Sequence, residues 1–207
     1  MNKKIIFLIL IFTIIVYFQY KFINTFNTEL EITQFKNPEK GIFEKMINEK
    51  TISIFTDINL HNPNNIIINE SEYDNNKLKI DKLLSSNLSY YDIPLCVKSS
   101  YDLKFKNAES VDLLLKQTRY RRLIYMISGT KRIVIFNNSQ AKYLYLQKNI
   151  SNVNFWAQDL KKYPLLNKSK YVEIILRDNM MISLPYGCIF TTINETPTTY
   201  VDIYSES

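Results

Sequence analysis

The sequence predicts a mainly β protein with a few short helices, preceded by an apolar segment at the amino terminus. After Pro94 the chain consists of short, mostly apolar runs separated by turn residues, which is typical of β-rich domains. The chain is 46% hydrophobic and 22% charged, so it has enough apolar residues for a buried core. Its 207 residues are sufficient for one domain, or for one domain with a small appendage.

The amino-terminal segment predicts a transmembrane helix that contacts the lipid bilayer through residues 5–20. Lys3 and Lys4 precede a run that is apolar from Ile5 to Phe18 except at Thr13. The run is slightly shorter than the ~20 residues of a typical spanning helix. No small-residue cleavage site follows it, which favours an uncleaved signal anchor; a cleaved signal peptide and a secreted protein remain the alternative.

The charges around this segment predict a single-pass membrane protein. The two lysines before it favour a cytoplasmic amino terminus, with the rest of the chain lumenal or external. Asn-x-Ser/Thr acceptors fit a lumenal domain, although several arise by chance in an Asn-rich chain: Asn69, Asn87, Asn137, Asn149, Asn167 and Asn194. We expect an anchor over 1–22, a stalk and the amino-terminal part of the domain over 23–95, and a β domain over 96–207.

The chain before Pro94 predicts few regular elements. We expect a polar stalk over 21–50 with a short helix near 42–47, and a strand over 51–58. Residues 61–76 are rich in Asn, Pro, Asp and Ser and predict a loop. Residues 77–89 predict a short helix.

The chain after Pro94 predicts a β-hairpin at 121–139 followed by further strands. Strands at 123–127 and 132–136 are joined by a Ser-Gly-Thr-Lys turn, in which Gly129 supplies a positive φ. A polar segment at 155–166 comes next. It is followed by strands at 171–177, 180–184 and 198–204, with Asn179 in a left-handed turn position.

Charge and rare residues exclude several function classes. The net charge is +6, but basic and acidic residues are interleaved along the chain, so we expect a solvated basic surface and no nucleic-acid partner. The single histidine, His61, cannot complete a Cys/His zinc site, and its place in an Asn-rich loop argues against a Ser-His-Asp triad. Three glycines cannot form a P-loop or a Rossmann pattern. Cys96 and Cys188 form either a disulfide or two unpaired buried thiols.

An ordered set of residues in the second half of the chain resembles the Jumonji/cupin-like domains related to iron- and 2-oxoglutarate-dependent oxygenases. The matching residues are Gly129 to Arg132, Ile133 to Phe136, Asp159-Leu160, Tyr163 to Leu165, Glu173 to Leu176, Asn179, Leu184-Pro185 and Thr198 to Tyr204. The resemblance covers roughly residues 116–205. It implies a double-stranded β-helix, a cupin or jelly-roll-like fold.

The resemblance also implies an iron site of two histidines and one carboxylate. The corresponding positions here are Lys116, Thr118 and Phe190, none of which binds Fe(II) as that triad does. We therefore expect no catalytic residues, no metal ligands and no cofactor.

One residue of the family's cosubstrate site is present. In active relatives the lysine at the position of Lys131 pairs with the far carboxylate of 2-oxoglutarate. Strand alternation places Arg122 with Ile124 and Met126, and Lys131 with Ile133 and Ile135. If these faces are interior, both cations are candidate contacts for an anionic ligand; the alternative is that both lie in water at the mouth of the barrel. A basic patch of Arg119, Arg121, Arg122, Lys131 and Arg132 is a further candidate.

These observations favour a membrane-anchored, catalytically inactive cupin-like domain that acts as a binding or structural module, with an unidentified protein or anionic ligand as its partner. One alternative is a hydroxylase-type enzyme with an unconventional metal site. The other is a membrane-anchored β-rich binding protein that is not a cupin.

Overall fold

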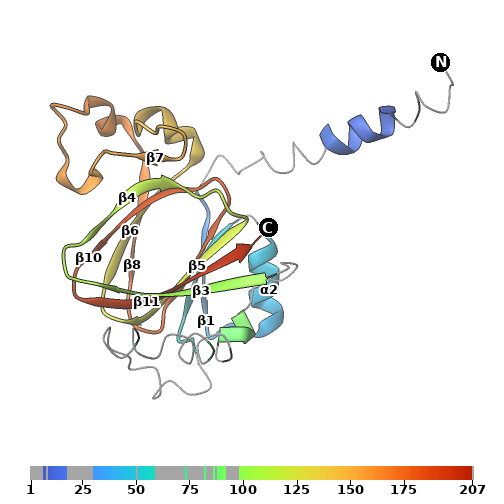
Figure 1. The fold of residues 1–207 in the computed structure, drawn as a ribbon, viewed down its shortest axis with the longest axis horizontal. Helices are drawn as coiled ribbons and strands as arrows, with labels where there is room; N and C mark the ends of the chain where they lie inside the picture. The colour runs from blue at the N-terminus through green and yellow to red at the C-terminus, as the bar shows by residue number, and fades with distance from the viewer. Residues whose placement is uncertain are drawn as a thin grey trace.

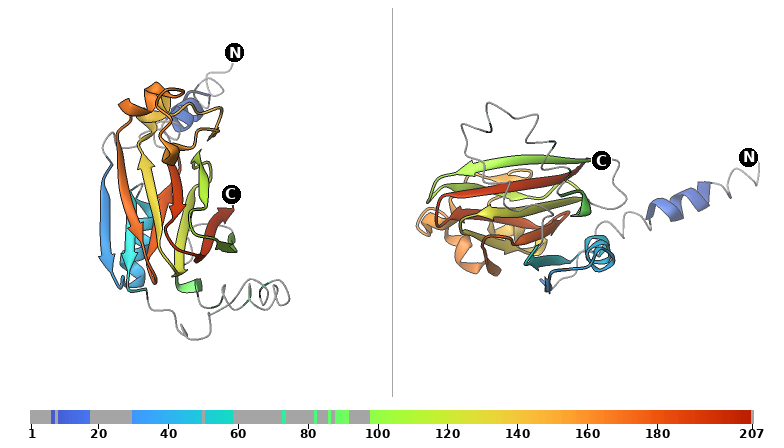
Figure 2. Two further views of the ribbon diagram at one scale, coloured as in Figure 1. Left: turned by 90° about the vertical axis from the view of Figure 1, so that its left-hand side faces the viewer. Right: turned by 90° about the horizontal axis from the view of Figure 1, so that it is seen from below.

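The protein is a sandwich of two β-sheets, as predicted for a mainly β chain (Figures 1 and 2). The computed structural model describes residues 7, 9–17, 30–49, 51–58, 73, 82, 86, 88–91 and 98–206. His61, Cys96, most of the predicted loop at 61–76 and most of the predicted helix at 77–89 lie outside the described residues.

The strands are divided between a six-stranded and a five-stranded sheet. The larger sheet has the order β1-β2-β9-β5-β11-β3: Ile32–Lys36, Ile52–Thr56, Met181–Pro185, Arg121–Ser128, Thr198–Glu206 and Lys98–Lys106. The smaller sheet has the order β7-β4-β10-β6-β8: Ile150–Ser151, Val111–Lys116, Ile189–Asn194, Lys131–Phe136 and Tyr171–Leu176. Apart from the parallel pair β1–β2, neighbouring strands are antiparallel.

The sequence located most of these strands correctly. Segments predicted at 51–58, 171–177, 180–184 and 198–204 correspond to β2, β8, β9 and β11. Asn179 adopts φ 60°, as expected for its turn position. The polar segment at 155–166 contains only short 3-10 turns, η4 (Phe155–Ala157) and the start of η5 (Pro164–Lys168).

The predicted hairpin at 121–139 is wrong in its pairing, although both strands and the turn are present. Strand β5 pairs with β9 and β11 in the larger sheet, whereas β6 pairs with β8 and β10 in the smaller one. The turn at Gly129 therefore connects the two sheets. Both strands are almost completely buried and have neighbours on both sides, so neither has a free edge for the other.

The turn between the sheets requires glycine at position 129. Gly129 has φ 91°, and an added Cβ would lie 2.3 Å from the carbonyl oxygen of Pro197. We expect Gly129→Ala to lower the free energy of unfolding by about 2 kcal/mol, because the left-handed conformation and the backbone clash both oppose a side chain. Chemical denaturation measures this change.

The control for this substitution is Gly41→Ala in helix α2 (Lys40–Asn48), where an added Cβ meets nothing within 4 Å. Alanine is the better helix former, so this variant should be neutral or more stable. Equal stability of Gly129→Ala and the wild type would contradict the proposed constraint at the turn.

Apolar side chains fill the space between the sheets and cover both outer faces. The interior cluster joins residues of the larger sheet, such as Ile124 and Met126, with Ile133, Ile135 and Phe190 of the smaller one. Helix α2 covers the outer face of the larger sheet through Phe43 and Ile47. Residues 32–56, which the sequence analysis placed in the stalk and the amino-terminal part, thus extend and cover this sheet; the domain boundaries themselves stay a prediction.

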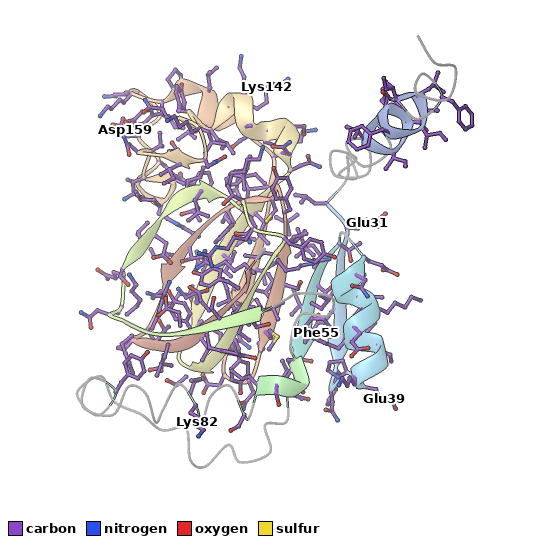
Figure 3. All side chains as sticks on the ribbon, turned by 45° about the vertical axis from the view of Figure 1, so that its right-hand side comes forward. Glu31, Glu39, Phe55, Lys82, Lys142 and Asp159 are labelled. Carbon is purple, nitrogen blue, oxygen red and sulfur yellow. The ribbon has the colours of Figure 1, made fainter. Side chains whose placement is uncertain are left out.

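The connection between β6 and β8 forms a lobe at one end of the sandwich (Figures 1 and 3). This lobe, residues 137–170, contains η3 (Asn138–Tyr143), the short strand β7 and the turns η4 and η5. Leu144, Val153, Phe155 and Leu166 pack on Val134, Phe136 and Ile189 of the smaller sheet. The lobe therefore shares a core with the sandwich.

The predicted transmembrane helix over 1–22 has no support in the structure. Residues 9–17 are helical, but no helix among the described residues is long and apolar enough to cross a membrane. The predicted bilayer contact of residues 5–20, the orientation and the secreted alternative stay predictions.

Candidate functional site

Arg122 and Lys131 both lie in the interior of the sandwich, with only 8% and 0% of their surface exposed. They belong to the faces of β5 and β6 that carry Ile124 and Ile133 into the interior cluster. Strand alternation therefore predicted their position correctly, and the alternative of a water-exposed barrel mouth is wrong. Their role as contacts for an anionic ligand stays a prediction.

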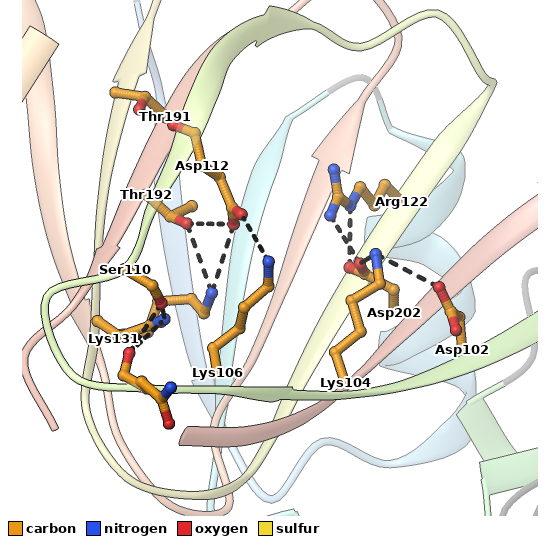
Figure 4. A network of polar contacts seen from close by, with 12 residues as sticks. Asp102, Lys104, Lys106, Ser110, Asp112, Arg122, Lys131, Thr191, Thr192 and Asp202 are labelled. Carbon is orange, nitrogen blue, oxygen red and sulfur yellow. Dashed lines mark hydrogen bonds and ion pairs between the residues drawn. The ribbon is translucent and has the colours of Figure 1, made fainter. Parts of the chain in front are cut away.

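Arg122 forms a two-pronged ion pair with Asp202 of β11 (Figure 4). Its Nε and Nη2 donate to Oδ1 and Oδ2 over 2.9 and 2.7 Å. Lys104 Nζ lies 2.7 Å from Oδ2 of the same carboxylate, and the Tyr204 hydroxyl donates to it over 3.0 Å. Asp202 thus accepts from three groups in a fully buried position.

The charges of this group stabilise one another. Burial by itself raises the pKa of Asp202, but the adjacent Arg122 and Lys104 charges lower that pKa overall. Burial by itself lowers the pKa of Arg122 and of Lys104, and Asp202 more than reverses both effects. All three groups are therefore charged at neutral pH.

Lys131 is held less tightly than Arg122. Its Nζ lies 3.6 Å from Oδ2 of Asp112, donates to Thr192 Oγ1 over 3.4 Å and lies 3.9 Å from the centroid of the Tyr200 ring. Burial lowers the pKa of Lys131 to about 8, and the attraction of Asp112 offsets this only in part. Thr192 donates to the same Asp112 oxygen over 2.7 Å, which leaves Asp112 shared between a hydroxyl and a cation.

A bulge in β4 brings Asp112 to Lys131. Along the β4–β10 ladder Phe190 is opposite Leu115, but Thr192 is opposite Asp112, so β4 has one extra residue between these pairs. The extra residue places both Asp112 and Leu115 toward the interior, although their odd spacing would put them on opposite faces of a regular strand. Strand alternation alone therefore does not predict that Asp112 faces the interior.

The three positions implied for an iron site do not form one. Lys116 ends β4 opposite Ile189, Thr118 is exposed, and Phe190 is buried on β10 with 1% of its surface exposed. The Arg122 guanidinium carbon lies 5.1 Å from the centroid of the Phe190 ring. A phenyl ring covered by a guanidinium offers no ligand and opposes a cation, so these residues do not fit Fe(II).

The part of the chain that the structure describes contains no group of three or more His, Cys, Asp or Glu that could hold a metal ion. The two carboxylates of the interior, Asp112 and Asp202, are both engaged by cations.

The five cations of the candidate basic patch do not form a surface patch, because Arg121, Arg122 and Lys131 are buried. Arg121 points away from the interior and donates to the Thr51 carbonyl over 2.9 Å and to Ser183 Oγ over 3.1 Å. Arg132 forms ion pairs with Glu173 and Glu195, both on the smaller sheet or the turn after it. Arg119 stacks on the Tyr204 ring at 4.3 Å from its centroid.

Cys188 is a free, buried thiol. Burial raises its pKa to about 12, which makes it a poor nucleophile. This agrees with the unpaired alternative for Cys188, and Cys96 lies outside the described residues.

Sequence analysis missed the partners of the two interior cations. Asp202, Tyr200 and Tyr204 lie on the closing strand, and residues two apart on a strand share a face. That spacing alone would have placed Asp202 between two inward-facing tyrosines. Lys104 lacked such a signal, because nothing in the sequence fixes the register of β3 against β11.

The fold and this interior site define a mainly β, two-sheet domain whose interior contains the ion pairs of Arg122 with Asp202 and of Lys131 with Asp112. No family model matches the chain. It is 35% identical over 74 residues to tRNA wybutosine-synthesizing protein 5 of Homo sapiens, and 34% identical over 73 residues to the Mus musculus protein of that name. The alignments cover 35% of this chain, and 24% and 23% of those proteins. This similarity supports, at most, a relation to the cupin and Jumonji-type proteins.

Proposed function

We propose that this chain is a non-catalytic double-stranded β-helix domain, related to cupin and Jumonji-type proteins, that acts as a structural or binding module. Strand order supports the fold assignment. Strands β3, β5, β9 and β11 belong to one sheet and β4, β6, β8 and β10 to the other, so the chain passes repeatedly between facing sheets as in a jelly roll.

The observation that carries the proposal is the contact between the Phe190 ring and the Arg122 guanidinium. An iron site needs electron-pair donors and tolerates no fixed cation among them. Here the position of the second histidine holds the phenyl ring of Phe190, and the Arg122 guanidinium over that ring is already paired with Asp202. Phe190 therefore offers no electron pair to a metal at this position.

The carboxylate of Asp112 is a second argument against a 2-oxoglutarate site. An acidic cosubstrate would have to pair with Lys131, but Asp112 already offers Lys131 a carboxylate at 3.6 Å. Like charges in a poorly solvated space repel strongly, so the carboxylate of Asp112 would oppose a second one.

The test uses the full chain. We expect no stoichiometric iron, manganese or zinc by elemental analysis, and no increase in melting temperature on adding Fe(II) with 2-oxoglutarate, because a ligand stabilises a fold only if it binds the folded state. Stoichiometric metal together with a clear shift would contradict the proposal and favour the hydroxylase with an unconventional site. If the protein bound metal but 2-oxoglutarate did not raise its melting temperature, the chain would have a metal site and would still lack a site for the oxygenase cosubstrate.

A further inference from the structure

The lobe of residues 137–170 carries most of the net charge of the protein. It contains six lysines and one acidic residue: Lys142, Lys148, Lys161, Lys162, Lys168, Lys170 and Asp159. Its net charge is therefore +5, out of +6 for the whole chain. Basic and acidic residues nearly balance elsewhere in the sequence, so the excess positive charge belongs to the lobe at one end of the sandwich, where Figure 3 labels Lys142 and Asp159.

All six lysines of the lobe are exposed. Among the described residues none of them forms an ion pair, whereas other lysines, such as Lys36, Lys40 and Lys106, lie beside carboxylates. Lys142 and Lys162 lie over neighbouring tyrosine rings, with Nζ at 5.0 and 5.2 Å from the ring centroids. The ammonium groups are thus available to an external anion.

The lobe holds these cations on a fixed frame. Asn137 and Asn154 accept from backbone N–H groups at the starts of η3 and η4, which fixes those turns. Trp156 Nε1 donates to Thr191 Oγ1 of β10 over 3.2 Å, and the Leu165 backbone N–H donates to the Tyr145 hydroxyl over 3.1 Å. A partner would meet an ordered surface.

A pocket of about 200 Å³ lies in this lobe. Its lining combines aromatic, apolar and polar side chains: Phe155, Gln158, Leu160, Leu166, Asn167, Ser169 and Tyr171. Leu160 and Tyr171 are 43% and 44% exposed, so the pocket has an apolar lip. Four of the six lysines lie within two positions of lining residues in the chain: Lys161 and Lys162 follow Leu160, and Lys168 and Lys170 flank Ser169.

We propose that the lobe binds single-stranded nucleic acid, with a base in the pocket and the adjacent phosphates on the lysines around it. Single strands are bound without sequence preference by a positive surface that follows the backbone and by aromatic side chains that stack on bases. Amide and hydroxyl groups in the pocket match the polar edge of a base. An anionic bilayer would use the lysines, but its headgroups carry no aromatic ring that could stack on the exposed Tyr171 side chain of the pocket.

This inference does not depend on whether the interior is catalytic, because the lobe packs on the outer face of the smaller sheet, whereas Arg122 and Lys131 lie between the two sheets. It also replaces the expectation of no nucleic-acid partner, which was based on the even spread of charge along the sequence. The positive charge is local, and the fold places it around a pocket.

The experiment measures binding of the full chain to a fluorescent single-stranded oligoribonucleotide of mixed sequence at several salt concentrations. The test variant is Lys162→Gln/Lys168→Gln/Lys170→Gln. The matched control, Lys36→Gln/Lys40→Gln/Lys45→Gln, removes the same charge from exposed positions outside the lobe. We expect the lobe variant to bind at least about tenfold more weakly and to reduce the salt slope of log K by about 2, as three lost phosphate contacts require. The control should bind as the wild type does.

Two competitors test the role of the pocket. Inorganic polyphosphate and vesicles containing anionic phospholipid carry the charge without a base. We expect both to compete more weakly than the unlabelled oligonucleotide. The proposal would be overturned if the two lysine variants lost binding equally, or if the wild type did not bind the oligonucleotide at all. It would also be overturned if polyphosphate competed as strongly as the oligonucleotide, or if the protein bound vesicles in preference to it.

Discussion

Replacing Asp202 with asparagine is expected to lower the free energy of unfolding by about 3–5 kcal/mol. The substitution keeps the shape of the side chain but removes its charge, and Arg122 then remains buried without a neutralising carboxylate. Breaking one side of a buried ion pair has effects of this size, because the remaining charge keeps its desolvation cost. Lys104, which is only partly exposed, loses its closest carboxylate as well. Urea denaturation of the two proteins at pH 7 measures the difference.

Asp102 supplies a matched control for Asp202. It lies opposite Asp202 across the β3–β11 ladder and also contacts Lys104, with 3.3 Å between Nζ and Oδ2. Its side chain is 52% exposed, so Asp102→Asn should cost less than about 1 kcal/mol. Similar losses in the two variants would show that burial does not decide the strength of these ion pairs.

The effect of Asp202→Asn should depend on pH in one direction. The folded state lowers the pKa of Asp202 below its ordinary value of 3.8, so the carboxylate contributes stability above the unfolded pKa. That contribution is lost as the pH falls through the lower, folded pKa. The gap in stability between the wild type and Asp202→Asn should therefore narrow progressively below about pH 4. A gap that stays constant down to pH 2 would contradict the linkage.

The sequence predicted the strands better than it predicted how they pair. Strand positions depend on local alternation and on turn residues such as Gly129 and Asn179, which the sequence displays directly. Pairing depends on which strand edges meet in space. The segments at 123–127 and 132–136 predicted a hairpin because a short turn joins them. In the structure the first pairs with β9 and β11, and the second pairs with β8, which follows the lobe in the chain. Only the packing of two whole sheets decides between these arrangements.

The site was predictable to the same extent. Strand alternation correctly predicted that Arg122 and Lys131 lie in the interior, because each shares a strand face with apolar residues of the interior cluster. Their carboxylate partners could not be found in this way. Asp112 faces inward only through the bulge in β4, and Asp202 reaches Arg122 only through the register of β5 against β11. The positive charge of the lobe, in contrast, was visible as six lysines and one aspartate within 34 residues, and the average over the whole chain concealed it.

Lys131 is the interior residue whose replacement should stabilise the fold. Burial lowers its pKa to about 8 from an ordinary 10.5, which means that the folded state disfavours the charged form. A difference of this size corresponds to about 3 kcal/mol lost at neutral pH. Methionine fills nearly the same space without a charge. We expect Lys131→Met to be about 1–3 kcal/mol more stable at pH 7, the lower values reflecting the lost contacts with Asp112 and the Tyr200 ring.

The pH dependence separates this explanation from a simple packing effect. An unfolded lysine keeps its proton up to about pH 10.5, whereas folded Lys131 releases it near pH 8, so the unfolded state binds more protons between these values. The wild type should therefore gain stability relative to Lys131→Met as the pH rises from 8 to 10.5, until the advantage of the variant is lost. Urea denaturation of both proteins at pH 7, 8, 9 and 10 measures this change.

Lys106→Met is the control for Lys131→Met. Lys106 also lies near Asp112, with 3.7 Å between Nζ and Oδ1, but its side chain is 40% exposed and its replacement should change stability by less than about 1 kcal/mol. A Lys131→Met variant that is less stable than the wild type at pH 7 would show that the contacts of the ammonium group outweigh its burial. The expected gain in stability of Lys131→Met would also bear on the role of this lysine. Residues that lower stability persist where they serve another purpose, so a destabilising Lys131 would indicate that this lysine has a role other than stabilising the fold.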